Sequence, residues 1–257
     1  LEYMVTDTEG IVLRQVKAAG GRRMISLFSK KFGKISVGTG MTEGGRSKTA
    51  LAVRPFSYGR YELFKSRDNY NLNSGHVIKS YYSLGENLDK YMAASYVLEL
   101  TDKILPEELP QPKLFSLLID FLDAVEKRGK KHNTLVMAYM VKLLDIAGMM
   151  PEIDSCVCCG EKFENRNRQK YIYFSIEEGG IICRKCVSKL SDGENRPLIY
   201  KADFDIIEIL KYFQRMPMQA FEKIALNDNM YNELQRIMKE YISYHMDIRG
   251  LKSESFF

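Results

Sequence analysis

The sequence has no long apolar run, because its hydrophobic stretches are short and interrupted by charges. A membrane-spanning helix needs about 20 consecutive apolar residues, so we expect no membrane span. There is also no internal repeat and no low-complexity segment. Residues 1–10 are acidic and polar and lack the basic and apolar regions of a secretory signal. Met4 is a candidate for the natural first residue, with Leu1 to Tyr3 added before it.

Signatures of common catalytic sites are missing as well. No histidine starts a His-x-Glu pattern and no cysteine follows a proline, which excludes the zinc deaminase signature. Residues 40–47 resemble a phosphate-binding loop but have Arg46 where such a loop has its lysine, and Pro55 limits any helix behind it. No G-x-S-x-G segment occurs, and no spacing singles out a pair of carboxylates. We therefore expect no catalytic residues and no enzymatic activity.

Negative charge is scarce in the first third of the chain. Residues 1–80 contain 14 Lys and Arg against 6 Asp and Glu, a balance of +8. The remaining 177 residues carry 24 basic and 27 acidic groups, a balance of −3. A basic first third on a nearly neutral body suggests a polyanionic partner for that third, although a solvated basic surface would give the same composition.

Alternating apolar residues predict five short strands in the same third, at 11–17, 23–29, 34–37, 56–65 and 70–80. In the first strand Ile11 and Leu13 are expected on one face and Val12 on the other. Five strands with glycine-marked turns favour a small barrel, with a five-stranded OB-fold as the first choice and an SH3-like barrel as the alternative.

The apolar period changes to 3.6 residues after Leu84. Stripes predict helices within 88–105, 114–125, 136–147, 206–213 and 230–242. The expected fold class is therefore α+β: an OB-fold barrel followed by a helical domain with an inserted four-cysteine module. We divide the chain into a basic barrel at 1–80, a first helical part at 81–150, a cysteine-containing module at 151–200 and a second helical part at 201–257.

Four of the five cysteines form two C-x-x-C pairs, Cys156 with Cys159 and Cys183 with Cys186, with 23 residues between the pairs. Two such hooks supply the four soft ligands of a structural Zn²⁺ site and leave no position open for water. We expect one structural zinc ion. Cys158 offers an alternative hook with Cys156, but Cys159 restores the two-residue spacing and precedes Gly160. Paired cysteines of this kind suit a reducing compartment, so a cytoplasmic location is expected.

Basic residues and aromatic rings are interleaved in the barrel region. Single-strand binders combine a cationic groove with rings on which bases stack. The aromatic candidates are Phe28, Phe32, Tyr58 and Tyr61, for which barrel core is the competing interpretation. The basic candidates for DNA contact are Arg14, Lys17, Arg22, Arg23, Lys30, Lys31, Lys34, Arg46, Lys48 and Arg60.

The order of these parts resembles the bacterial RecO family over nearly the whole chain. The resemblance is carried by residues 9–14 (EGIVLR), 25–29 (ISLFS), 32–35 (FGKI), Pro55-Phe56, the strand at 58–63, the paired cysteines and residues 251–253 (LKS). The sequence departs from the family's pattern in a less basic loop at 42–48 and in Gly250 after Arg249.

The resemblance implies a recombination mediator of DNA repair. Such a protein would bind single- and double-stranded DNA, anneal complementary strands, and work with RecR to load RecA onto strands coated by single-strand binding protein, in the cytoplasm at the nucleoid. The alternative from another class is a zinc-stabilised protein–protein adaptor without a nucleic-acid role, and the charge asymmetry argues against it.

Overall fold

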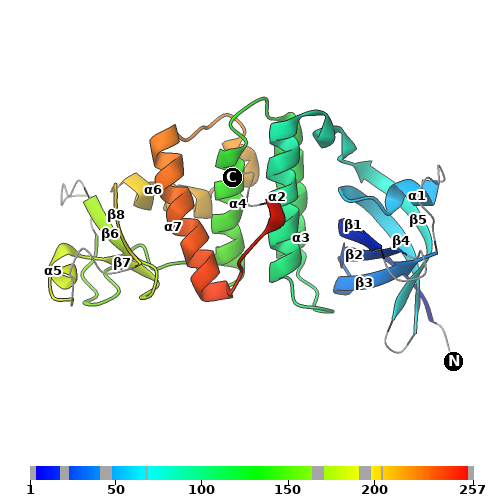
Figure 1. Ribbon diagram of the computed structural model, residues 1–257, viewed down its shortest axis with the longest axis horizontal. Coiled ribbons are helices and arrows are strands. Elements are labelled where there is room, and N and C mark those ends of the chain that lie inside the picture. Colours follow the sequence, from blue (N-terminus) through cyan, green and yellow to red (C-terminus); the bar gives the residue numbers. More distant parts are fainter. Residues whose placement is uncertain are drawn as a thin grey trace. The chain divides into compact units, whose positions relative to one another are not determined.

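The computed structural model describes residues 4–17, 23–40, 48–66, 69–163, 171–190, 198–203 and 205–253 (Figure 1). The chain forms two compact units. The first comprises Leu1–Lys127 together with Gly250–Phe257, and the second comprises Arg128–Arg249.

The first unit contains a closed five-stranded barrel with the strand order β1-β2-β3-β5-β4. Strand β1 closes the sheet because it pairs antiparallel with both β2 and β4. Strands β3 and β5 meet in a short parallel contact, Val37 with Tyr70 and Gly38 with Asn71. The strands are β1 (Met4–Lys17), β2 (Arg23–Ser29), β3 (Gly33–Thr39), β4 (Ser57–Lys65) and β5 (Tyr70–Ser80). All five predicted strands are therefore present, and β1 starts seven residues earlier than expected.

Strand β1 is buried on both of its faces over residues 11–13. Ile11, Val12 and Leu13 are all buried. Val12 belongs to the barrel core, and helix α2 (Leu88–Ile104) packs on β1, so the strand has apolar surroundings on both of its faces. The pairing with β2 also shifts register between Val12 and Arg14, which marks a bulge.

Four helical segments accompany the barrel: α1 (Lys48–Ala52), η2 (Tyr82–Glu86), α2 (Leu88–Ile104) and α3 (Pro112–Lys127). The side chain of Asn87 begins α2 by accepting a hydrogen bond from the backbone N–H of Lys90 at 3.0 Å. At the end of the chain, Glu99 of α2 accepts hydrogen bonds from the backbone N–H groups of Lys252 and Ser253 and from the Ser253 hydroxyl. These bonds fasten residues 250–253 to the first unit.

The second unit joins helices to a small sheet that periodicity did not predict. Its sheet has the order β7-β6-β8, with β6 (Tyr171–Ser175) in the centre. None of the described helices is long and apolar enough to cross a membrane. The remaining elements are α4 (Asn133–Ile146), β7 (Gly180–Ile182), α5 (Arg184–Val187), β8 (Ile199–Asp203), α6 (Asp205–Arg215), η4 (Met218–Phe221) and α7 (Asp228–Met246).

A glycine holds the β2–β3 turn against the segment before α3. Gly33 has φ +71°, and a Cβ placed on it would lie 2.2 Å from the carbonyl oxygen of Leu109. The neighbouring contact is a backbone hydrogen bond from Glu108 N–H to the Lys34 carbonyl at 2.9 Å. Close approach and left-handed backbone both require glycine here.

We predict that Gly33→Ala lowers the free energy of unfolding by about 2 kcal/mol or more, because the new Cβ collides with backbone and adopts a strained φ. Urea denaturation, followed by a spectroscopic signal of the first unit, measures the free energy of unfolding. The matched control is Gly85→Ala, since a Cβ at Gly85 meets nothing within 4 Å. Equal stability of the two variants would contradict the prediction.

Candidate metal centre and basic surface of the barrel

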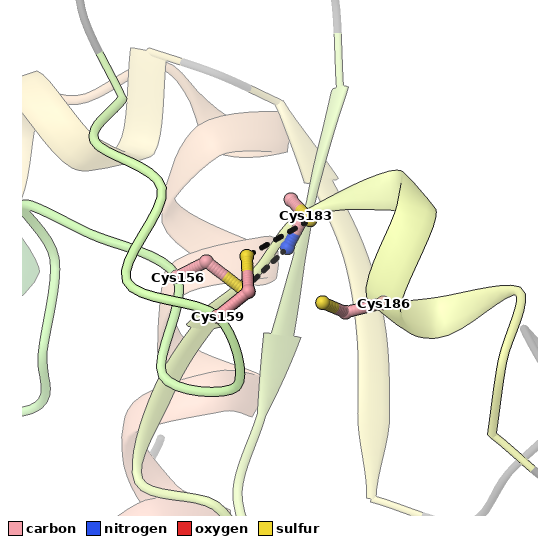
Figure 2. A group of neighbouring side chains, drawn as sticks. All are labelled: Cys156, Cys159, Cys183 and Cys186. Carbon is pink, nitrogen blue, oxygen red and sulfur yellow. Dashed lines mark hydrogen bonds between the residues drawn. The ribbon is translucent and has the colours of Figure 1, made fainter.

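The first cysteine pair lies in a tight hairpin. The backbone N–H of Cys156 donates to the Glu161 carbonyl at 2.8 Å, and the N–H of Gly160 donates to the Cys156 carbonyl at 2.8 Å. Gly160 has φ +72°, a left-handed conformation that glycine adopts without steric cost. The turn brings the Cys156 and Cys159 side chains to the same side of the hairpin (Figure 2).

The second pair lies where a strand becomes a helix. Cys183 follows β7 and is the N-cap residue of α5. Its carbonyl accepts hydrogen bonds from the N–H groups of Cys186 at 3.0 Å and Val187 at 3.1 Å. This single helical turn directs Cys186 back toward the other three cysteines (Figure 2).

Together the two hooks bring four sulfur atoms within 4.8 Å of one another, from Cys156, Cys159, Cys183 and Cys186. A tetrahedral Zn²⁺ with bonds of about 2.3 Å requires sulfur–sulfur separations of roughly 3.8 Å. The Cys159 and Cys183 sulfurs are 3.8 Å apart. The donor set therefore fits a four-thiolate zinc site with every position filled by protein, and Cys158 is exposed and outside the group.

Electrostatics at the cluster also favour a cation. Burial opposes ionisation of Cys156, but backbone N–H donors from Cys183, Cys158 and Cys159 outweigh it and lower the pKa of this thiol to about 7. Burial and the neighbouring sulfurs, Cys159 first, raise the pKa of Cys186. Several thiolates this close repel each other unless a positive ion lies between them.

The cluster forms part of a small apolar core rather than an open cleft. Cys156 and Cys183 are buried and pack with Tyr173, Ile182 and Val187. The backbone N–H of Val157 donates to the Ile181 carbonyl at 2.9 Å, which attaches the hairpin to β7. Such a closed set of ligands is typical of a structural site.

We predict about one zinc ion per chain in protein purified without chelator. Because thiolate ligation couples metal binding to folding, Cys183→Ser should lower the zinc content and reduce the thermal stability of the second unit. Zinc release should also increase as the pH falls and protons compete for the thiolates.

Metal analysis and calorimetry check these expectations. Cys158→Ser is the matched control and should keep both zinc and stability. A metal-free wild-type protein with unchanged thermal stability would exclude the zinc site.

The predicted DNA-contact residues of the barrel divide into groups with different partners. Arg14 Nε lies 3.1 Å from an Asp102 carboxylate oxygen, and the Ser26 hydroxyl donates to the other oxygen at 2.5 Å. Lys34 donates to the Asp102 carbonyl at 2.8 Å and pairs with Glu107 at 3.0 Å. The Lys34 side chain is only 13% exposed. Arg14 and Lys34 thus attach the barrel to α2 and the segment that follows it.

A second group surrounds Glu9. Its carboxylate accepts hydrogen bonds from Lys30 Nζ at 2.5 Å and from the Tyr58 hydroxyl at 2.6 Å, and Arg60 lies 3.7 Å away. The hydrogen bond from Lys30, followed by that from Tyr58, lowers the pKa of Glu9. One carboxylate thereby offsets part of the charge of two candidate cations.

The structure describes the side chains of three further candidates, and it does not describe those of three others. Arg23 donates to the Gln15 side chain at 2.9 Å, Lys31 donates to the Thr6 hydroxyl at 3.2 Å, and Lys17 ends β1. Arg22, Arg46 and the side chain of Lys48 lie outside the described residues.

Two of the aromatic candidates are core residues, as the competing interpretation expected. Phe28 and Tyr61 are fully buried, and Tyr58 is bonded to Glu9. Phe32 is partly exposed. Sequence reasoning missed Lys65, whose ammonium lies 5.6 Å from the Phe32 ring centroid and 5.0 Å from that of Tyr70. No motif marks Lys65, and only its ring neighbours single it out.

Comparison with known proteins gives one consistent result. The family model described as Recombination protein O N terminal matches residues 4–81, and the model described as Recombination protein O C terminal matches residues 85–255. The chain is 32% identical to a protein of Alkaliphilus metalliredigens over 249 residues, which is 95% of each chain. It is 29% identical to a protein of Bacillus pumilus over 253 residues, covering 98% of this chain and 93% of that one. Both relatives bear the name DNA repair protein RecO.

Proposed function

The chain belongs to the RecO family of DNA repair proteins, and we propose that it is a recombination mediator that binds DNA without catalysing a covalent reaction. In this role it binds single- and double-stranded DNA and anneals complementary strands. With RecR it helps to load RecA onto strands coated by single-strand binding protein. The observation that carries the proposal is the match of both family models, which together span residues 4–81 and 85–255.

We further propose that the barrel is an OB-fold and is the DNA-binding domain, residues 1–80. Its support is the closed five-stranded sheet with the order β1-β2-β3-β5-β4 and the short helix α1 between β3 and β4. OB-folds commonly bind single strands. In this division of labour, residues 81–150 and 201–257 form the helical scaffold and residues 151–200 form the zinc module.

Charge supports binding directed at the phosphate backbone. The first 80 residues have a balance of +8. Backbone-directed contacts position DNA without reading its sequence. The partners RecR, RecA and single-strand binding protein are proposed from the family alone.

We predict that the protein accelerates annealing of complementary strands and does so equally with and without ATP. A basic surface screens phosphate repulsion and leaves base edges free, so pairing itself drives the reaction. A fluorescence annealing assay with labelled strands measures the rate. Absence of acceleration at every protein concentration would remove the mediator role, and an ATP requirement would contradict the non-enzymatic role.

We also predict that Glu9→Gln strengthens DNA binding, because it releases Lys30 and Arg60 from their shared carboxylate. If both cations then contact single-stranded phosphates, the logarithmic salt slope should steepen by roughly 1.4, about 0.7 per phosphate. Titration of single-stranded DNA across a salt series measures affinity and slope together.

Glu62→Gln is the matched control for this change. It removes the same charge from the barrel, but among the described residues the Glu62 carboxylate bonds to the neutral side chains of Asn73 and Ser74 and to no cation. Equal effects of the two substitutions would mean that Lys30 and Arg60 lie off the path of the DNA.

A further inference from the structure

A small group of cations and rings lies at one end of the barrel, where the β2–β3 turn meets the end of β4 and the start of β5. Phe32 is in the turn, Lys65 ends β4 and Tyr70 begins β5. The Phe32 and Tyr70 ring centroids are 5.7 Å apart. Lys31 Nζ is 5.3 Å and Lys65 Nζ is 5.6 Å from the Phe32 centroid.

These two lysines differ from three other cations of the barrel, which form ion pairs. Arg14 pairs with Asp102, while Lys30 and Arg60 share Glu9. Within the described part of the chain, neither Lys31 nor Lys65 forms an ion pair. Lys31 donates to the neutral Thr6 hydroxyl and lies over the Phe32 ring. Lys65 hydrogen-bonds to the Tyr70 side chain, and the negative charge of Glu108 acts on it electrostatically. Because no described carboxylate forms an ion pair with either ammonium group, a phosphate can bind them without first displacing a carboxylate.

The turn that carries Phe32 is held in place on both sides. The buried Ser29 hydroxyl accepts from the backbone N–H groups of Lys31 at 3.2 Å and Phe32 at 3.0 Å. Gly33 lies against the backbone of Leu109. Phe32 also packs on the barrel core, whereas its side chain stays partly exposed. Because the ring is already held in one position, little conformational entropy is lost when a ligand binds to it.

We infer that Phe32 is a stacking platform for a base of single-stranded nucleic acid, with Lys31 and Lys65 contacting the adjacent phosphates. The inference rests on the proposed function and names the part of the barrel that distinguishes single strands from duplexes. A duplex keeps its bases stacked on each other and offers only phosphates to this group. A single strand offers both phosphates and a free base face.

The present positions of the lysines are compatible with this role. A cation over a partly exposed ring such as that of Phe32 is held weakly, while a base stacks on an aromatic ring more strongly. A base can therefore replace an ammonium group on the ring face. The displaced lysine remains within reach of the phosphate on either side of that base, because its flexible side chain starts beside the ring.

The test compares a thymidine strand with a strand of equal length made of abasic sites. Phe32→Leu keeps apolar bulk on the barrel core but removes the π face, so affinity for the thymidine strand should fall about 10-fold while affinity for the abasic strand stays unchanged. The double variant Lys31→Gln, Lys65→Gln should weaken binding of both strands and reduce the logarithmic salt slope by roughly 1.4.

A fluorescent reporter tests the contact directly. The chain has no tryptophan, so Phe32→Trp introduces a single indole. Its emission should be quenched by the thymidine strand and not by the abasic strand. The matched control is the pair Arg54 and Tyr82, another cation–ring contact of the first unit, with Arg54 5.9 Å from the ring centroid. Tyr82→Leu should leave the affinity for both strands unchanged, and Tyr82→Trp should show no quenching.

The outcomes separate this inference from the proposed function. A wild-type protein that binds neither strand would overturn the proposed function itself. A wild-type protein that binds both strands, with Phe32→Leu binding the thymidine strand equally well, would overturn the stacking platform alone. An equal loss of affinity for the thymidine strand in Phe32→Leu and Tyr82→Leu would also overturn the stacking platform.

Discussion

Strand β1 uses both of its edges: residues 4–11 pair with β4 and residues 10–17 pair with β2. The barrel closes only because this one strand is long enough to reach both neighbours and to overlap at Gly10 and Ile11. Gly10 lies against Leu27, and a Cβ there would approach the Leu27 side chain to 2.9 Å. Closure removes the free edges that a five-stranded open sheet would present. It also fills the interior with apolar side chains and leaves the basic residues no position except the outer surface.

Closure of the barrel therefore determines which charged side chains on its outer surface can form ion pairs. The outer face of β1 and β2 presents Arg14 and Ser26 side by side, and Asp102 of α2 binds both. On another part of the surface, Glu9 of β1 meets Lys30 of the β2–β3 turn and Arg60 of β4. Exposed ion pairs contribute little to stability, typically about 0–1 kcal/mol. Their larger effect is to lower the local positive potential, so the basic residues counted in the sequence do not all act on a polyanion with equal strength.

The sequence predicts elements well where one face is apolar, and poorly where the buried residues are polar or the strands are short. Residues 4–10 were missed because the inward side of β1 there carries Thr6 and Thr8, which are buried and, in the case of Thr8, bonded to the Ser29 hydroxyl at 2.8 Å. Strands β6 to β8 were missed because they are short and show no alternation: residues 172–175 of β6 and all three residues of β7 are buried, so a period of two is not visible. The cysteine group was predictable because each of its two C-x-x-C pairs is a pattern within four consecutive residues. The partner of Arg14 was not, because Asp102 lies 88 residues away in the chain.

The pairing of cations also bears on how a mediator would release DNA. Under the proposed function, the protein must bind two strands, let them pair, and then leave the product. If every cation of the surface were free, each phosphate that it neutralises would add to the affinity for DNA. Release of the DNA product would then become slow at low salt. Carboxylates such as Glu9 reduce that gain by competing with phosphate for the same ammonium groups. Binding would then depend more on contacts that only an unpaired strand can make, such as stacking of a base, and annealing itself removes those contacts when the base enters a duplex.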